Sequence, residues 1–189
     1  MLISIFAPPS VLLLDVTSLS DVFAEANRVA GVAAYRLQVI SEARAPLITA
    51  SGLRLMADRL TLDPDEPADT LFVTGPLDVP RTSNGELQVW LRRQADAARR
   101  FGAVRTGAFL LAATGLLDGR QVTTHWRYAD LLASQFPAAI VRPGRIFVRD
   151  GRLFTAAGAA AGMDLALALV EEDLGVAAAT MVARQLTMA

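Results

Sequence analysis

The sequence predicts an α/β fold, a three-layer α/β/α sandwich in which helices cover both faces of a mainly parallel sheet. Short apolar runs, at residues 2–6 and 70–74, have the composition of strands that are buried on both faces. A segment of helical periodicity at residues 15–29 lies between strands, and alternation of strand and helix favours a parallel sheet. The chain has 189 residues, of which 53% are apolar, and this suits one compact domain over residues 1–189.

The first half of the chain supplies most of the expected sheet. Pro8 and Pro9 close the first strand, and Gly31 can end the following helix because glycine adopts a left-handed backbone readily. The pattern predicts further strands at residues 35–41 and 70–74, and between them a small hairpin of residues 47–49 and 53–56.

The second half alternates in the same way. Ser83 and Asn84 can cap a long helix that runs through residue 100, with its arginines mostly outward: Arg92, Arg93, Arg99 and Arg100. The elements expected after it are a strand at 101–104, a helix at 108–114, a strand at 122–124, a helix at 128–136, a hairpin of 147–149 and 153–155, and helices at 161–174 and 176–187.

Composition excludes several classes of function. The chain holds 18 basic residues, all of them arginine, against 19 acidic residues, so its net charge of −1 gives no electrostatic footprint for nucleic acid. It contains no cysteine, which excludes disulfides, cysteine-ligated metals and a cysteine nucleophile. The single histidine has no ligand cluster around it, so neither a metal nor another cofactor is expected. No targeting or membrane segment is apparent, and a cytoplasmic location is expected.

The motif that carries most information is Gly-Ala-Val-Arg-Thr-Gly at residues 102–107. A short strand, one central residue and a glycine that opens a helix have the layout of a nucleophile elbow. In such an elbow the central side chain, here Arg105, projects from a strained turn at the carboxyl end of a strand. The backbone N–H groups that follow it favour an anionic or carbonyl oxygen in the same crevice.

Residues 102–126 as a whole closely resemble the elbow region of the ThiJ/PfpI superfamily of class I glutamine amidotransferase-like domains. Within that superfamily the chain is most similar to the domains found at the N-terminus of AraC-type transcription regulators. Further matching segments occur in order along the chain: residues 15–23 with Ala26-Asn27, 51–53, 69–75, Phe136-Pro137, 150–155, Gly158, Gly162, Asp164 and 171–175. The resemblance implies a flavodoxin-like central sheet and a DNA-binding helix-turn-helix region that would follow residue 189.

The chain departs from the family at the centre of the elbow. The resemblance implies a nucleophilic cysteine there, but Arg105 occupies the position, and a guanidinium stays protonated and has no lone pair with which to attack a substrate. By similarity, Asp15 stands where the supporting acid of the family stands, Thr106 follows the elbow, and Gly75 and His125 line the same pocket. The sequence therefore predicts a pseudo-active site.

Three roles for Arg105 remain open at this stage. Its guanidinium can pair with Asp15 in a closed structural ion pair, hold an anionic ligand, or leave the crevice for solvent. His125 is expected to be a hydrogen-bonded packing residue, and Thr106 is expected to cap the helix that begins beside it. Trp90 and Trp126 are expected to line the core or the pocket wall.

Two functions follow as hypotheses. The first is a non-catalytic, effector-sensing and dimerising domain of an AraC-type regulator, which takes an anionic or amino-acid-like effector and contacts DNA only through a further domain. The alternative is a stand-alone enzyme with altered chemistry, similar to the isonitrile hydratases or hydrolases of the family. A homodimer is the expected assembly because two-fold symmetry is the commonest closed arrangement.

Overall fold

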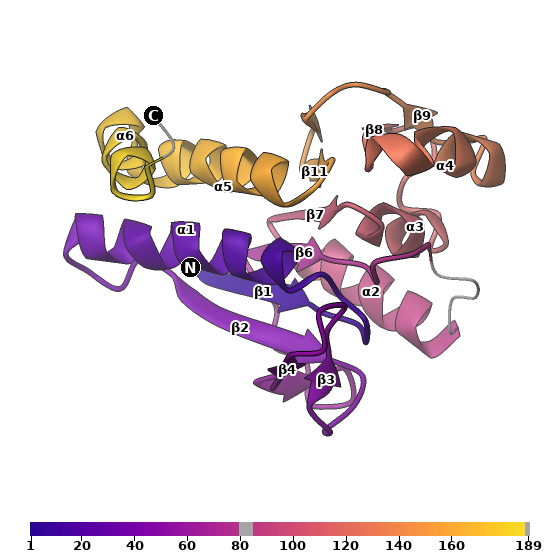
Figure 1. Ribbon diagram of the computed structural model, residues 1–189, viewed down its shortest axis with the longest axis horizontal. Helices are drawn as coiled ribbons and strands as arrows, with labels where there is room; N and C mark the ends of the chain where they lie inside the picture. Colours follow the sequence, from indigo (N-terminus) through magenta and orange to yellow (C-terminus); the bar gives the residue numbers. More distant parts are fainter. Residues whose placement is uncertain (80–84, 188–189) are drawn as a thin grey trace.

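A seven-stranded sheet forms the centre of the computed structural model, which describes residues 1–79 and 85–187 (Figure 1). Its strand order is β10-β11-β7-β6-β1-β2-β5, and every neighbouring pair is parallel except β10 with β11. The strands are β1 (Leu2–Phe6), β2 (Arg36–Ser41), β5 (Arg59–Leu60), β6 (Thr70–Val73), β7 (Arg100–Val104), β10 (Phe147–Asp150) and β11 (Leu153–Ala156). The predicted α/β class with a mainly parallel sheet is confirmed.

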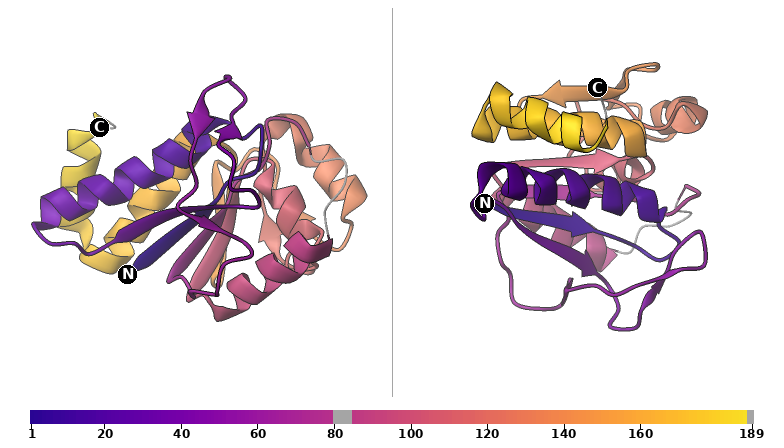
Figure 2. Two further views of the ribbon diagram at one scale, coloured as in Figure 1. Left: turned by 90° about the horizontal axis from the view of Figure 1, so that it is seen from below. Right: turned by 60° about the vertical axis from the view of Figure 1, so that its left-hand side comes forward.

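Helices cover both faces of this sheet and give the three layers seen in Figure 2. One face packs against α1 (Leu13–Ala30), α5 (Ala159–Leu174) and α6 (Val176–Gln185), and the other packs against α2 (Gly85–Ala97), α3 (Gly107–Ala112) and α4 (Ala129–Gln135). The central strands β1, β6 and β7 are buried along their whole length. This double burial explains why they are continuous apolar runs instead of alternating ones.

Smaller elements complete the fold. The predicted hairpin is present as the antiparallel pair β3 (Leu47–Ile48) and β4 (Arg54–Leu55), which projects beyond the end of the sheet (Figure 1). A parallel pair, β8 (Gln121–Val122) and β9 (Ile140–Val141), precedes β10, and a 3₁₀ turn, η1 (Trp126–Tyr128), leads into α4. The sequence pattern did not reveal the two-residue strands β5 and β9.

The boundary between α2 and β7 corrects the sequence-based expectation. The helix ends at Ala97, and Arg100 opens β7 with only 2% of its surface exposed. The prediction that Arg100 points outward is therefore wrong, whereas Arg92, Arg93 and Arg99 are exposed. Helical periodicity continues through this segment, but the pairing of β7 with β6 on one side and β11 on the other overrides local propensity. The predicted cap at residues 83–84 lies outside the described residues.

The termination of α1 agrees with the prediction. Gly31 adopts φ +67° just after the helix, and its N–H donates to the carbonyl of Arg28. The helix places Asp15 in its first turn, fully buried, at the carboxyl edge of the parallel strands. Within the described residues, no helix is both long enough and apolar enough to cross a bilayer.

Candidate functional site: an elbow centred on Arg105

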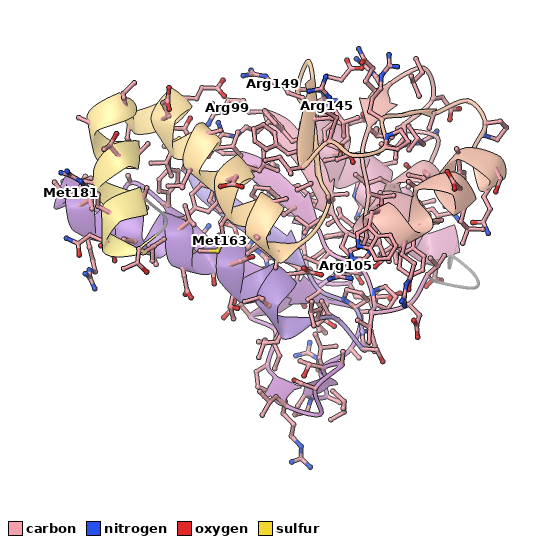
Figure 3. All side chains as sticks on the ribbon, turned by 45° about the horizontal axis from the view of Figure 1, so that its top comes forward. Arg99, Arg105, Arg145, Arg149, Met163 and Met181 are labelled. Carbon is pink, nitrogen blue, oxygen red and sulfur yellow. The ribbon has the colours of Figure 1, made fainter. Side chains whose placement is uncertain are left out.

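The turn between β7 and α3 has the geometry of an elbow. Arg105 adopts φ +57°, a left-handed conformation that is uncommon for any residue other than glycine. Hydrogen bonds on both sides hold it: its N–H donates to the carbonyl of Ala156 (2.9 Å), and its own carbonyl accepts from the Thr124 hydroxyl (2.6 Å). The side chain therefore projects from the carboxyl end of β7, near the first turns of α1 and α5 (Figure 3).

Two glycines allow the neighbouring backbone to pass close to this turn. A Cβ on Gly107 would lie 2.0 Å from the carbonyl oxygen of Val73, and a Cβ on Gly75 would lie 2.5 Å from the amide nitrogen of Gly107. Both distances are shorter than the 3.0 Å below which Cβ atoms essentially never approach another heavy atom. Gly75, which the sequence placed in the pocket, thus has a spacing role: it lets the segment after β6 lie directly against the elbow.

Arg105 and Asp15 form an ion pair beside this turn. The Arg105 Nε lies 3.2 Å from Asp15 Oδ2, with the arginine side chain 16% exposed and the aspartate side chain 0% exposed. The contact is not an aligned hydrogen bond, and both Asp15 oxygens and the Arg105 Nε lack hydrogen-bond partners among the described residues. Of the three roles left open by the sequence, the structure contains the internal pair, and the arginine does not leave the crevice.

The environment of Asp15 makes it an unusual carboxylate. Burial raises its pKa from 3.8 to about 6, and the charge of Arg105 offsets only part of that increase. Carboxylates that accept several hydrogen bonds have pKa values below the ordinary range, so the missing hydrogen bonds are consistent with this direction. Asp15 therefore changes protonation state close to neutral pH.

Thr106 is fully buried, but it does not cap α3. Its hydroxyl donates to the backbone carbonyl of Pro76, and no side-chain cap is made at the start of the helix. The capping prediction is wrong because the hydroxyl points across to the segment that Gly75 brings close. Thr106 thus joins the end of β6 to the elbow, and its hydroxyl proton is already donated within the protein.

His125 lies half-buried next to the elbow. Its Nδ1 accepts a hydrogen bond from the Arg127 N–H (3.4 Å), and its ring contacts those of Trp126 and Tyr128. Burial lowers its pKa, and the charges of Arg105 and Arg127 lower it further, so the ring is neutral at pH 7. Trp90 is in the core as predicted, but Trp126 is 74% exposed and is neither a core residue nor a wall of a closed pocket.

Sequence reasoning missed two participants at this site. Ser18, only 3% exposed, has a hydroxyl without a hydrogen-bond partner among the described residues. Its spacing of three residues from Asp15 places both on one face of α1, a signal that was available in the sequence. Gly158, which precedes α5, lies so close to Arg105 that a Cβ there would be 4.0 Å from Nη2.

The assembled site can recognise an anion, but it offers no nucleophile at its centre. The guanidinium is a permanent cation with several donors, and the whole chain contains no cysteine. Within residues 1–79 and 85–187, no three potential metal-ligating side chains come together. The site therefore has the shape of a catalytic elbow and the chemistry of a charge-recognition site.

A mainly parallel α/β sheet with an elbow at its carboxyl edge defines a class of domains that place one reactive or binding residue at that turn. The family model described as DJ-1/PfpI matches residues 2–172. The chain belongs to the DJ-1/PfpI family, which confirms the resemblance drawn from the sequence.

Relatives that are named for a function include an enzyme and several transcriptional regulators. The chain is 36% identical to an isonitrile hydratase of Pseudomonas putida over 96% of its own length and 75% of the relative. It is 32% identical to the transcriptional regulator CdhR of Pseudomonas aeruginosa, and 34% identical to the regulator GlxA of Rhizobium meliloti. Those matches cover 82% and 86% of this chain but only 45% and 50% of the regulators, so the chain spans about half their length.

Solved structures agree on the fold. An AraC family transcriptional regulator from Pseudomonas putida superposes with a TM-score of 0.85 at 24% identity over 98% of both chains. Drosophila melanogaster DJ-1beta superposes with a TM-score of 0.77 at 17% identity, over 98% of this chain and 97% of its own. The architecture is thus shared by proteins with very different sequences.

Proposed function

We propose that this chain is the non-catalytic, effector-sensing domain of an AraC-type transcription regulator, and that it dimerises. The observation that carries the proposal is Arg105 at the centre of the elbow in a chain without cysteine. A guanidinium cannot replace a thiolate in attack on a substrate, but it is well suited to bind a carboxylate or another anion. Similarity to CdhR and GlxA, both named as transcriptional regulators, supports this assignment.

The effector we propose is anionic or amino-acid-like and binds in the crevice of Asp15, Arg105 and His125. DNA recognition would belong to a further domain, because a net charge of −1 does not indicate the basic surface that binding a polyanion such as DNA requires. Dimerisation would bring two such domains together on a two-fold axis, the arrangement that suits paired DNA half-sites.

A ligand screen tests the sensing proposal. Thermal unfolding of the purified chain is measured with a panel of amino acids, betaines and small carboxylates, in parallel with Arg105→Gln. We expect at least one compound to raise the melting temperature of the wild-type chain and not that of the variant. No stabilisation by any compound, or equal stabilisation of the variant, contradicts a ligand role for Arg105. Sedimentation equilibrium tests the dimer, and a monomer at all concentrations would exclude it.

A second candidate function is an enzyme with altered chemistry. The identity of 36% to an isonitrile hydratase over 96% of this chain favours it, as do Asp15 and Thr106 beside the elbow. The discriminating measurement is consumption of an isonitrile by the wild-type chain and by Asp15→Asn. Turnover by the wild-type chain that the substitution abolishes would establish an enzyme; we expect none.

A further inference from the structure

Buried polar atoms without hydrogen-bond partners occur in the ion pair of the elbow and three residues further along α1. Asp15 Oδ1 and Oδ2, Ser18 Oγ and Arg105 Nε have no hydrogen-bond partner among the described residues. Buried polar groups in folded proteins are nearly always hydrogen-bonded, and an ionised carboxylate without such bonds is costly. The free molecule thus holds Asp15 in an unfavourable state that the uptake of a proton relieves.

A second feature beside this ion pair favours an anion. The helix α5 has 16 residues and begins next to the guanidinium, with no side-chain cap and no acidic residue in its first turn. The positive end of the helix dipole and a cationic side chain therefore face the same volume. A Cβ on Gly158, the residue before the helix, would lie 4.0 Å from Arg105 Nη2, so the two positive groups are close. An anion bound beside the guanidinium at the start of α5 would be stabilised by both.

We propose that the elbow binds a small organic carboxylate as an anion and takes up one proton on Asp15 in the same step. The ligand carboxylate replaces Asp15 as the partner of Arg105, and the Asp15 carboxylate becomes a neutral carboxylic acid. No covalent bond to carbon forms or breaks, and the proton comes from solvent. This inference rests on the proposed sensing function and adds to it a ligand class and a dependence on pH.

Charge balance is the reason for the coupling. In the free site one carboxylate faces one guanidinium, whereas a bound anion would bring a second negative charge into a buried space. Protonation of Asp15 restores neutrality, and its pKa of about 6 makes that proton accessible near neutral pH. His125 is another titratable group on which the charge of Arg105 acts, and at the start of α5 the uncharged Gly158 lies against the guanidinium. His125 is therefore the rival proton acceptor, which the experiment must separate from Asp15.

Calorimetric titration of the whole chain with acetate tests the proposal. We expect acetate to bind the wild-type chain with uptake of one proton, measured from buffers of different ionisation enthalpy, and with a dissociation constant that rises about tenfold between pH 7 and pH 8. Asp15→Asn, which imitates the protonated acid, should bind acetate at pH 8 as tightly as at pH 7. Arg105→Gln should not bind it.

The controls assign the proton and guard against misfolding. In His125→Gln the uptake of one proton should persist; its loss would move the proton to His125 and overturn the role of Asp15. In the wild-type chain, the carbon-13 resonance of the Asp15 carboxyl should titrate at a higher pH when acetate is present, which requires no variant to fold. A pKa that acetate leaves unchanged overturns the proposal.

Two negative results have different meanings. Acetate binding without proton uptake, and with the same pH dependence in Asp15→Asn, overturns the coupling and leaves the sensing function intact. No acetate binding by either the wild-type chain or Asp15→Asn overturns the carboxylate site, whereas the sensing function stands or falls on the wider thermal screen.

Discussion

The strand β7 begins at one arginine, Arg100, and is followed directly by another, Arg105. Each pairs with a buried aspartate, but the two pairs differ in how many hydrogen bonds the aspartate accepts. At the start of the strand, Arg100 Nε donates to the Thr70 hydroxyl (2.7 Å), and its Nη1 donates to Asp173 Oδ1 (3.1 Å). Asp173 also accepts from Arg99 (2.9 Å) and from the Tyr35 hydroxyl (3.1 Å). Just after the strand ends, the pair of Arg105 and Asp15 makes no aligned hydrogen bond.

This contrast separates an ion pair whose aspartate stays ionised from one whose aspartate can take up a proton. Burial raises the pKa of Asp173, but the hydrogen bonds and charges of Arg100 and Arg99 outweigh burial and hold the pKa below its ordinary value. For Asp15, burial outweighs the single cation, and the pKa increases to about 6. A buried charge stays ionised where hydrogen bonds surround it, and becomes a proton acceptor where they are missing.

The largest effect is expected from breaking the satisfied pair with Asp173→Ala. The change removes the buried carboxylate from the guanidinium of Arg100, which keeps only the Thr70 hydroxyl and the more distant Glu172 carboxylate at 3.8 Å. We expect a loss of about 3–5 kcal/mol in the free energy of unfolding. Urea denaturation at pH 7 measures it. The matched control is Asp96→Ala, whose salt bridge to Arg152 is 63% exposed on the acidic side and should cost less than about 1 kcal/mol. Equal losses in the two variants would contradict the contrast.

The pH dependence of stability should have opposite signs at the two aspartates. The folded pKa of Asp15, about 6, lies above its ordinary value of 3.8, so its contribution to stability falls as pH rises through this window. A shift of this size corresponds to about 3 kcal/mol. As the pH rises from about 4 to about 6, Asp15→Asn should therefore gain stability relative to the wild-type chain, and at higher pH the difference should level off. Asp173, with a lowered pKa, should instead contribute more stability as the pH rises.

The control for this prediction is Asp21→Asn on the exposed side of the same helix. This variant removes a carboxylate from α1 and leaves the elbow unchanged. If the stability difference between Asp15→Asn and the wild-type chain changes with pH no more than the control difference does, the buried position of Asp15 does not determine its protonation.

The sequence anticipated the elbow and the crevice more fully than it anticipated this contrast. Glycine spacing and the apolar runs predicted β7, α3 and the central position of Arg105, because these depend on local chemistry. Arg100 was misplaced because it follows a helical segment and only the pairing of β6, β7 and β11 makes it a buried strand residue. The state of the Asp15 pair also could not be predicted, since hydrogen-bond alignment depends on how α1 and α5 pack around it.

A smaller effect is expected from Arg105→Met. The Nε of the Arg105 side chain makes no aligned hydrogen bond, and Asp15 can take a proton. We therefore expect the free energy of unfolding to change by less than about 1 kcal/mol at pH 5. The pKa of Asp15 should rise above 6, since the neighbouring cation that lowers it is gone. Carbon-13 NMR titration of the carboxyl resonances measures this, with Asp173 as the internal reference. An unchanged Asp15 pKa would show that the guanidinium does not act on it.

A similarly small effect is expected from Tyr35→Phe, which removes one hydrogen bond from the satisfied pair and leaves the aromatic ring in place. The ring packs edge-on against Phe23 with centroids 4.8 Å apart, and that packing is retained. We expect a loss of about 1 kcal/mol, because Asp173 keeps its arginine partners. In the control Tyr128→Phe, the hydroxyl lost is an exposed one, 3.4 Å from Asp78, and the change should be near zero. A loss for Tyr35→Phe as large as that for Asp173→Ala would mean that the tyrosine hydroxyl, and not the two arginines, keeps Asp173 ionised. The number of cationic donors would then no longer explain why the Arg100–Asp173 and Arg105–Asp15 pairs differ.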